Sequence, residues 1–148
     1  MGRVSDELGA KVYLDTNIII YALEGFAAFD DQIKALLQAM DDGEISAITS
    51  ELTLAEVLVK PIKDQDTTIQ QLYRSFLTAS PVLQMVPIGR NILEEAAHLR
   101  ATTKLKMPDA IHLATTNLTG CDSFLSNDVL FKSVGTGSVK LLSDVSLI

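Results

Sequence analysis

Short apolar runs of strand length alternate with segments of helical length along this chain. Strands are predicted at 12–14, 45–49, 83–86, 123–126 and 139–142. Strands that are separated by helices pair in parallel, because a parallel connection needs about a dozen residues or more. The sequence therefore predicts an α/β fold, with a parallel central sheet of about five short strands flanked by helices on both faces.

Helices are predicted between these strands, at about 16–24, 30–40, 50–60, 67–77, 90–103 and from Pro108 onward. Pro108 suits the first turn of a helix, where a missing backbone N–H costs nothing. Pro61 is expected to end the helix before it, because proline removes a backbone donor and disfavours helical geometry in the preceding residue.

Length and composition indicate a single domain over residues 1–148, with 47% hydrophobic and 21% charged residues. No apolar run approaches the roughly 20 residues that a membrane helix needs. The first residues lack the apolar core of a secretory signal, and the lone Cys121 has no partner for an internal disulfide. We therefore expect a cytoplasmic protein that does not associate with a membrane.

Four acidic residues lie in or beside apolar segments, namely Asp15, Glu56, Asp109 and Asp128. Carboxylates are rarely buried without a partner, and no basic residue is the direct sequence neighbour of any of the four. A shared divalent cation is the simplest partner, because it stabilises ionised carboxylates that otherwise raise each other's pKa. Asp15 and Asp128 also follow predicted strands, at the edge of a parallel sheet where ligands bind.

Each acid, taken alone, also has an ordinary structural explanation. Asp15 can cap the helix that follows it, and Asp109 lies in a helical first turn, where negative charge is favoured. Asp128 can be a turn residue. Glu56 is harder to explain, because it lies in mid-helix, where only a solvent-facing position remains. The set as a whole is therefore more informative than its members.

Oxygen ligands, without His or Cys at ligand spacing, favour Mg²⁺ or Mn²⁺ over zinc. Carboxylate sites of this kind support phosphodiester hydrolysis, in which the metal lowers the pKa of a water molecule and neutralises charge on the leaving oxygen. The chain has no GxxxxGK[ST] phosphate loop, no GxGxxG fingerprint and no GxSxG elbow. Rival chemistries therefore lack their characteristic parts.

Two histidines complete the inventory of candidate residues. His112 lies three residues after Asp109 and shares its helix face, but a packing role is favoured over a contact with substrate or a proton relay. His98 is expected at a helix surface or boundary, and no function is assigned to it.

The net charge of −7 argues against binding of nucleic acid through a broad basic surface. It does not exclude nucleic acid as a substrate. A local path of cations is conceivable, although scattered, solvated charges explain the same residues equally well: Lys60, Lys63, Arg100, Lys104 and Lys106.

Four segments, in chain order, resemble the motifs of PIN-domain nucleases, in particular the VapC-type toxins of toxin–antitoxin pairs. They are 14–21 (LDTNIIIY), 54–58 (LAEVL), 108–114 (PDAIHLA) and 124–128 (FLSND). Each motif is short, but four in this order are specific, and the resemblance covers nearly the whole chain from Val12 onward. Relative to the family, residues 1–10 form an N-terminal extension, and Ser126 stands where threonine is common.

The resemblance implies a PIN fold in which Asp15 and Asp109 are the central ligands of Mg²⁺ or Mn²⁺, while Glu56 and Asp128 complete the pocket. It also implies a homodimeric ribonuclease, acting on RNA such as tRNA or rRNA and silenced by an antitoxin protein whose tail lies near the active site. The polar positions that support the ligands in the family correspond to Thr16, Asn17 and Ser126.

These observations lead to the hypothesis of a metal-dependent endoribonuclease that hydrolyses RNA phosphodiester bonds as the toxin of a toxin–antitoxin pair. One alternative is a PIN-like module that binds RNA or protein without cleavage, although the complete set of acids argues against it. Another is a metal-dependent DNA nuclease, because recognition of the 2′-OH cannot be read from these residues.

Overall fold

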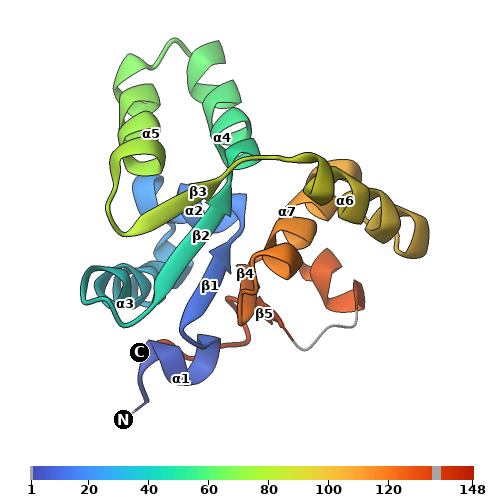
Figure 1. Ribbon diagram of the computed structural model, residues 1–148. Helices are drawn as coiled ribbons and strands as arrows, with labels where there is room; N and C mark the ends of the chain where they lie inside the picture. Colours follow the sequence, from blue (N-terminus) through green and yellow to red (C-terminus); the bar gives the residue numbers. More distant parts are fainter. Residues whose placement is uncertain (1, 135–137) are drawn as a thin grey trace.

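The computed structural model describes residues 2–134 and 138–148 and contains one five-stranded sheet (Figure 1). All neighbouring strands pair in parallel, in the order β3-β2-β1-β4-β5. The predicted α/β fold is confirmed, and the predicted strands agree within about one residue at each end. The strands are β1 (Lys11–Leu14), β2 (Ser46–Ser50), β3 (Leu83–Val86), β4 (Ser123–Ser126) and β5 (Val139–Leu141).

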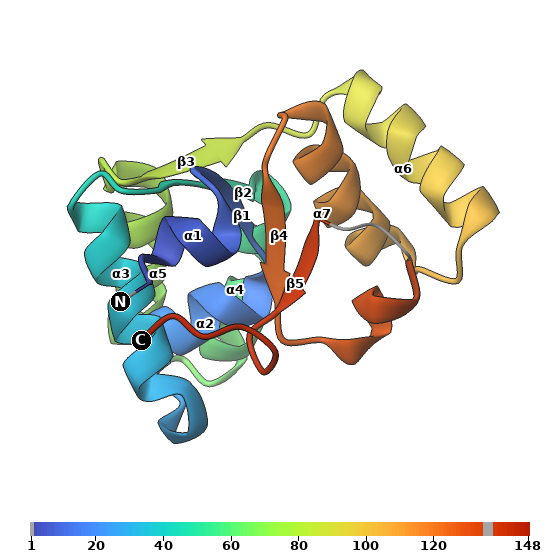
Figure 2. The same cartoon turned by 90° about the horizontal axis from the view of Figure 1, so that it is seen from below.

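Helices cover both faces of the sheet, as predicted (Figure 2). One face packs against α1 (Val4–Leu8), α2 (Thr16–Glu24), α3 (Asp30–Asp41), α4 (Glu51–Lys63) and α5 (Thr67–Ala79), with the short 3-10 helix η1 (Ala27–Phe29) before α3. The other face packs against α6 (Arg90–Thr102), α7 (Met107–Leu118) and the 3-10 helix η2 (Val129–Val134). Among the described residues, no helix combines the length and apolar character needed to cross a membrane.

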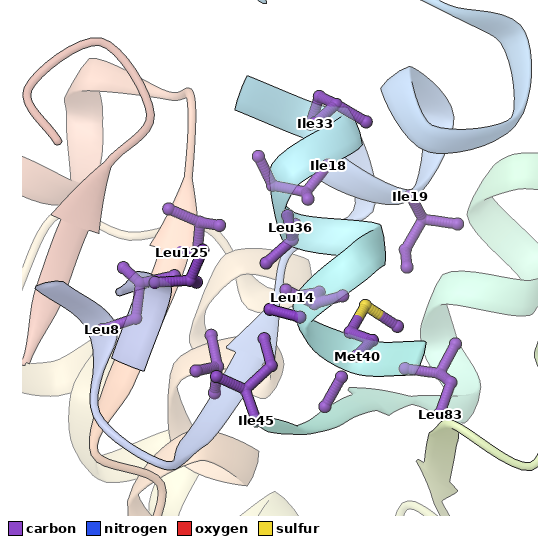
Figure 3. Close-up of a cluster of buried hydrophobic side chains, with 14 of the residues drawn as sticks. Leu8, Leu14, Ile18, Ile19, Ile33, Leu36, Met40, Ile45, Leu83 and Leu125 are labelled. Atoms are coloured by element: carbon purple, nitrogen blue, oxygen red, sulfur yellow. The ribbon is translucent and has the colours of Figure 1, made fainter. Parts of the chain in front are cut away.

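Residues of the central strands alternate between the two cores of the domain. Leu14 of β1 and Leu125 of β4 point into the core beneath α2 and α3 (Figure 3). Tyr13 and Phe124 point into the opposite core, where their rings stack with centroids 5.4 Å apart. Because both faces are buried, each central strand has consecutive apolar residues rather than apolar residues at alternate positions only.

The prediction that Pro61 ends its helix is wrong, because α4 continues to Lys63. Pro61 cannot donate a hydrogen bond to the preceding turn, which normally disfavours a helix interior. However, Pro61 is buried, and its carbonyl accepts hydrogen bonds from the backbone N of Asp66 at 2.8 Å and from Gln70 Nε2 at 3.1 Å. These contacts tie the end of α4 to the start of α5, so tertiary packing outweighs the local preference.

The segment before β1 is packed onto the domain through α1. Val4 and Leu8 are buried in the core shared with α3. The Ser123 hydroxyl donates to the carbonyl of Leu8 at 2.7 Å, and Glu44 accepts from the backbone N of Ser5 at 2.7 Å. Residues outside the resemblance noted above therefore contribute to the same hydrophobic core.

Gly9 makes the turn from α1 into β1. Its φ of +81° lies in a region that favours glycine. The Asp122 carboxylate lies against this turn and accepts hydrogen bonds from the backbone N of Ala10 and of Lys11, both at 2.9 Å. A Cβ on Gly9 would lie 2.4 Å from the Cβ of Asp122. The turn therefore requires glycine both for its backbone conformation and for the space beside it.

Gly9→Ala is expected to destabilise the fold by about 1–3 kcal/mol more than Gly25→Ala does. The two glycines have nearly the same φ, +81° and +83°, but an added Cβ at Gly25 meets no atom within 4 Å. The difference between the variants therefore isolates the clash with Asp122, and urea unfolding of both measures it. Equal losses of stability would show that the Asp122 turn moves freely to accept the side chain.

Candidate functional site

Asp15 is the most deeply buried of the four acids. It directly follows β1 and caps α2, because its Oδ1 accepts a hydrogen bond from the backbone N of Thr16 at 2.8 Å. Its Oδ2 accepts from Ser126 Oγ at 2.7 Å and from Asn17 Nδ2 at 3.3 Å. The capping explanation for Asp15 is therefore confirmed, and further polar contacts fix the direction of the second carboxylate oxygen.

Asn17 and Ser126 join the start of α2 to the end of β4. Asn17 Nδ2 also donates to Ser126 Oγ at 3.2 Å, and Asn17 Oδ1 accepts from the backbone N of Asn127 at 3.1 Å. Ser126 Oγ, fully buried, accepts in addition from the backbone N of Asp128 at 3.0 Å. Of the three polar residues singled out in the sequence, Asn17 and Ser126 contact Asp15 through their side chains, and Thr16 contacts it through its backbone N.

Glu56 reaches the same edge of the sheet from α4. Its Oε1 accepts hydrogen bonds from Thr16 Oγ1 at 2.7 Å and from His112 Nε2 at 2.6 Å. Burial of Glu56 disfavours its charged form, but the hydrogen bonds and charge supplied by His112, together with Thr16, outweigh burial and lower the pKa of Glu56. Glu56 is therefore the acid whose charge this part of the protein stabilises.

The His112 ring connects Glu56 to Tyr13. Its Nδ1 lies 2.6 Å from the Tyr13 hydroxyl. Burial, followed by the nearby charge of Asp15, raises the pKa of Tyr13 well above its usual value, so this hydroxyl keeps its proton. Because ionised Glu56 can only accept, His112 Nε2 is the donor of the hydrogen bond between them. Partners on both sides of the ring thus fix the orientation of His112.

The sequence favoured a packing role for His112 and did not predict its hydrogen bonds in the site. The packing role is confirmed, because His112 is buried and lies edge-on to the Tyr13 ring, with centroids 5.8 Å apart. The hydrogen bonds come in addition, and Nε2 lies 3.9 Å from Asp15 Oδ1. The spacing of three residues from Asp109 was the only signal in the sequence. His98, by contrast, is exposed on α6, as expected.

Asp109 and Asp128 approach Asp15 from two further elements. Asp109 lies in the first turn of α7, and Asp128 follows β4, where its Oδ1 accepts from the backbone N of Leu130 at 3.0 Å. The turn role considered for Asp128 is therefore confirmed. Burial raises the pKa of Asp109, and the charges of Asp15 and Asp128 raise it further. The fold thus brings acids that are distant in sequence within electrostatic range of one another.

The charge balance at this edge is unfavourable to ionised carboxylates. Burial also raises the pKa of Asp15, although His112, Ser126 and Thr16 oppose the shift. Acids with raised pKa values that share a site are characteristic of functional centres. Residues of this chain therefore compensate the charge of Glu56 more completely than the charges of Asp15 and Asp109.

The donor atoms at this edge fit a hard divalent cation in their chemistry, because carboxylate oxygens are the ligands that Mg²⁺ and Mn²⁺ prefer. Their arrangement is more open than a coordination shell. Within 2–134 and 138–148, no three His, Cys, Asp or Glu side chains are grouped closely enough to hold a metal ion as they stand. Asp109 and Asp128 are both partly exposed, whereas Asp15 is fixed by its hydrogen bonds.

Comparison with known proteins identifies the fold. Residues 12–136 match the PIN domain family. The chain belongs to this family. The match starts within β1 and includes all four segments that carry the acids of the site, so the predicted resemblance to PIN-domain proteins is confirmed. Helix α1 lies outside the matched residues. No curated relative matches the chain by sequence.

Several solved structures share the fold of this PIN domain. A toxin–antitoxin complex from Klebsiella pneumoniae contains a chain that is 27% identical, with a TM-score of 0.67 over 90% of this chain and 99% of the other. VapC20 from Mycobacterium tuberculosis, a sarcin–ricin loop cleaving toxin, is 16% identical, with a TM-score of 0.65 over 86% and 98%. FitAcB from Neisseria gonorrhoeae is 16% identical, with a TM-score of 0.69 over 90% and 99%.

Asp109→Asn is expected to stabilise the metal-free PIN domain at neutral pH. The folded-state pKa of Asp109 is raised above the ordinary value of 3.8, so ionisation of Asp109 destabilises the folded state once the pH exceeds its raised pKa. The variant should melt about 2–4 °C higher, the shift that roughly 1 kcal/mol gives in a domain of this size. Thermal unfolding in EDTA across the acidic and neutral range measures it.

The stabilisation should shrink as the pH falls from the raised pKa of Asp109 to 3.8 and should vanish below 3.8, where wild-type Asp109 is protonated in both states. Glu94→Gln, which removes an exposed carboxylate from α6, is the matched control and should leave the melting temperature nearly unchanged. An Asp109→Asn variant that melts below wild type at neutral pH would contradict the electrostatic account of the site.

His112→Leu is expected to destabilise the PIN domain by about 1–3 kcal/mol, because it removes the buried hydrogen bond between His112 Nδ1 and the Tyr13 hydroxyl. His98→Leu changes an exposed histidine in the same way and should stay within about 0.5 kcal/mol of wild type. Urea unfolding of the two variants compares them. Equal losses of stability in the two variants would mean that the hydrogen bonds of His112 do not contribute to stability.

Proposed function

We propose that this PIN domain is a Mg²⁺- or Mn²⁺-dependent endoribonuclease and the toxin of a toxin–antitoxin pair. The observation that carries the proposal is the convergence of Asp15, Glu56, Asp109 and Asp128, from four elements, on the edge of the sheet where β1 and β4 end. A phosphate placed among these four carboxylates is repelled unless a cation binds with it. Metal-assisted cleavage of a phosphodiester is the chemistry that needs a phosphate and a cation at the same site.

Each acid has a distinct part in the proposal. Asp15 and Asp109 would hold the ion at the centre, with Glu56 and Asp128 completing the pocket. A divalent ion bound there supplies positive charge that lowers the pKa of a water molecule and neutralises the leaving oxygen. The support for Asp15 as the fixed ligand is its set of hydrogen bonds, which hold the carboxylate in one orientation: Thr16, Asn17 and Ser126.

The hydrogen-bond network beside the acids gives Glu56 a second role. Its Oε1 is held by His112 and Thr16, so the direction of the carboxylate is set before any substrate arrives. A preorganised charge of this kind costs no rearrangement when the phosphate binds. His112 therefore acts in the proposal as a positioning residue for Glu56.

The partners in this proposal are an RNA substrate, an antitoxin protein and a second copy of the chain, in the cytoplasm. The similar chain from Klebsiella pneumoniae, in a toxin–antitoxin complex, supports the antitoxin. Helices α4 and α5, which stand out from the sheet in Figure 1, carry exposed apolar side chains that support contact with a protein partner. Three apolar side chains on this pair of helices are about half exposed, namely Val59, Ile62 and Leu72.

Purified protein is expected to cut single-stranded RNA in Mg²⁺ or Mn²⁺ and not in EDTA. Asp15→Asn should lower the rate by more than roughly 100-fold, because even groups that only support a metal ligand contribute about 10- to 100-fold. Gel assays on a mixed RNA and on single-stranded DNA of the same sequences measure the cleavage and its preference for RNA. Glu94→Gln is the matched control and should cut as wild type does.

The alternatives give different results in the same assay. Cleavage of DNA in preference to RNA would replace the ribonuclease by a DNA nuclease. Binding of RNA or of a partner protein, without metal-dependent cleavage of any substrate, would favour the non-cleaving module. Cleavage that survives in Asp15→Asn would show that the activity belongs to a contaminant or to another site.

A further inference from the structure

A hollow of about 480 Å³ lies beside one of the four acids, Asp109, between the connection from α6 to α7 and the helix η2. Figure 2 shows these two segments next to each other, on the side of the sheet opposite α2 and α3. Asp109 forms part of its wall. The volume lies in the range of pockets that hold small molecules or single nucleotides. A group bound in the hollow would therefore lie directly against a residue of the candidate active site.

The hollow has an apolar interior. Leu105 is buried beneath it, and Leu130 and Val134 of η2 line its other side. Leu130 is 62% exposed, although it lines a concave surface. An apolar wall of this kind suits the flat face of a nucleobase that has left its stack.

Two lysines line the hollow as well. Lys104 and Lys106 are exposed, and neither forms an ion pair within the part of the chain that the structure describes. Lys60, by contrast, pairs with Asp64 at 2.9 Å. Among the basic residues noted in the sequence analysis, Lys104 and Lys106 are therefore the ones whose position beside the hollow allows them to bind a phosphate. They lie next to Asp109 in a chain whose net charge is −7.

The hydroxyl groups around the hollow are already engaged. Thr103 Oγ1 donates to the carbonyl of Leu99 at 2.6 Å, Thr102 Oγ1 to that of His98 at 3.0 Å, and Ser133 Oγ to that of Leu130 at 2.9 Å. These groups keep their bonds inside the protein, so a bound base would be held mainly by shape and apolar contact. Such contacts tolerate different bases.

We propose that this hollow is a subsite for one unstacked nucleotide of a single-stranded RNA, with its base against Leu130 and Leu105 and its phosphate on Lys104 and Lys106. The inference rests on the proposed ribonuclease function and adds the place where the substrate strand is held. It follows that RNA whose bases are free to leave the stack binds better than a duplex, because a paired base cannot enter the hollow.

The test measures binding in EDTA, where cleavage does not interfere. The probe is a short, fluorescently labelled single-stranded RNA of random sequence, and the readout is fluorescence anisotropy over a series of salt concentrations. Leu130→Gln should weaken binding roughly fivefold, since it removes apolar contact. Lys106→Ala should weaken binding and lower the salt dependence, the slope of log K against log salt, by about 0.7, the value for one phosphate contact on a single strand.

The chain offers matched controls for both variants. Val129 is 67% exposed and adjacent to Leu130 but does not line the hollow, so Val129→Gln should bind as wild type does. Lys63→Ala removes an exposed lysine from α4, away from the hollow, and should keep the full salt dependence. All four changes are at exposed positions, and circular dichroism melts verify that each variant is folded.

The outcomes separate this inference from the proposed function. If wild type cleaves RNA but Leu130→Gln and Lys106→Ala bind RNA as their controls do, the subsite is overturned and the proposed ribonuclease function is retained. Loss of binding in these two variants alone would support the subsite, even if wild type with Mn²⁺ cuts nothing and the ribonuclease proposal fails. Wild type that binds no RNA at any salt concentration of the series would also overturn the subsite.

Discussion

Burying the Asp15 carboxylate at the end of β1 costs free energy, and much of the site is arranged around that cost. Burial raises its pKa, while hydrogen bonds from Thr16 and Ser126 and the nearby His112 work in the opposite direction. Asn17 completes the set and ties the start of α2 to β4. The carboxylate is therefore held in one direction before it meets any ligand, which is what a metal ligand requires.

The polar network also joins the two layers of helices across the edge of the sheet. Thr16 and Glu56 come from α2 and α4 on one face, whereas His112 comes from α7 on the other. The Tyr13 ring packs in the second core, and its hydroxyl anchors His112. Tyr13 and His112, the buried members of this network, depend on each other, because either polar group would be costly if its partner were lost. The same contacts thus hold the layers together and place Glu56.

Uncompensated charge and local cations lie side by side at this end of the domain. Asp109 has a raised pKa because burial and neighbouring acids disfavour its charge, and it also forms a wall of the hollow lined by Lys104 and Lys106. In the proposed function, an acidic chain accepts an RNA strand because attraction is needed only along the short path beside the acids. The proposed metal-binding edge and the hollow would then act on neighbouring parts of one strand.

The sequence by itself determined the parallel α/β fold, the strand positions and the four acids, because alternating apolar runs and short motifs are local properties of the chain. It misplaced the end of α4, since the contacts that carry the helix past Pro61 come from α5. Only the tertiary structure decided that His112 bonds to both Glu56 and Tyr13, and which lysines lie beside Asp109. These are contacts between segments far apart in the chain, and residue spacing carries no information about the distance between such segments once they fold.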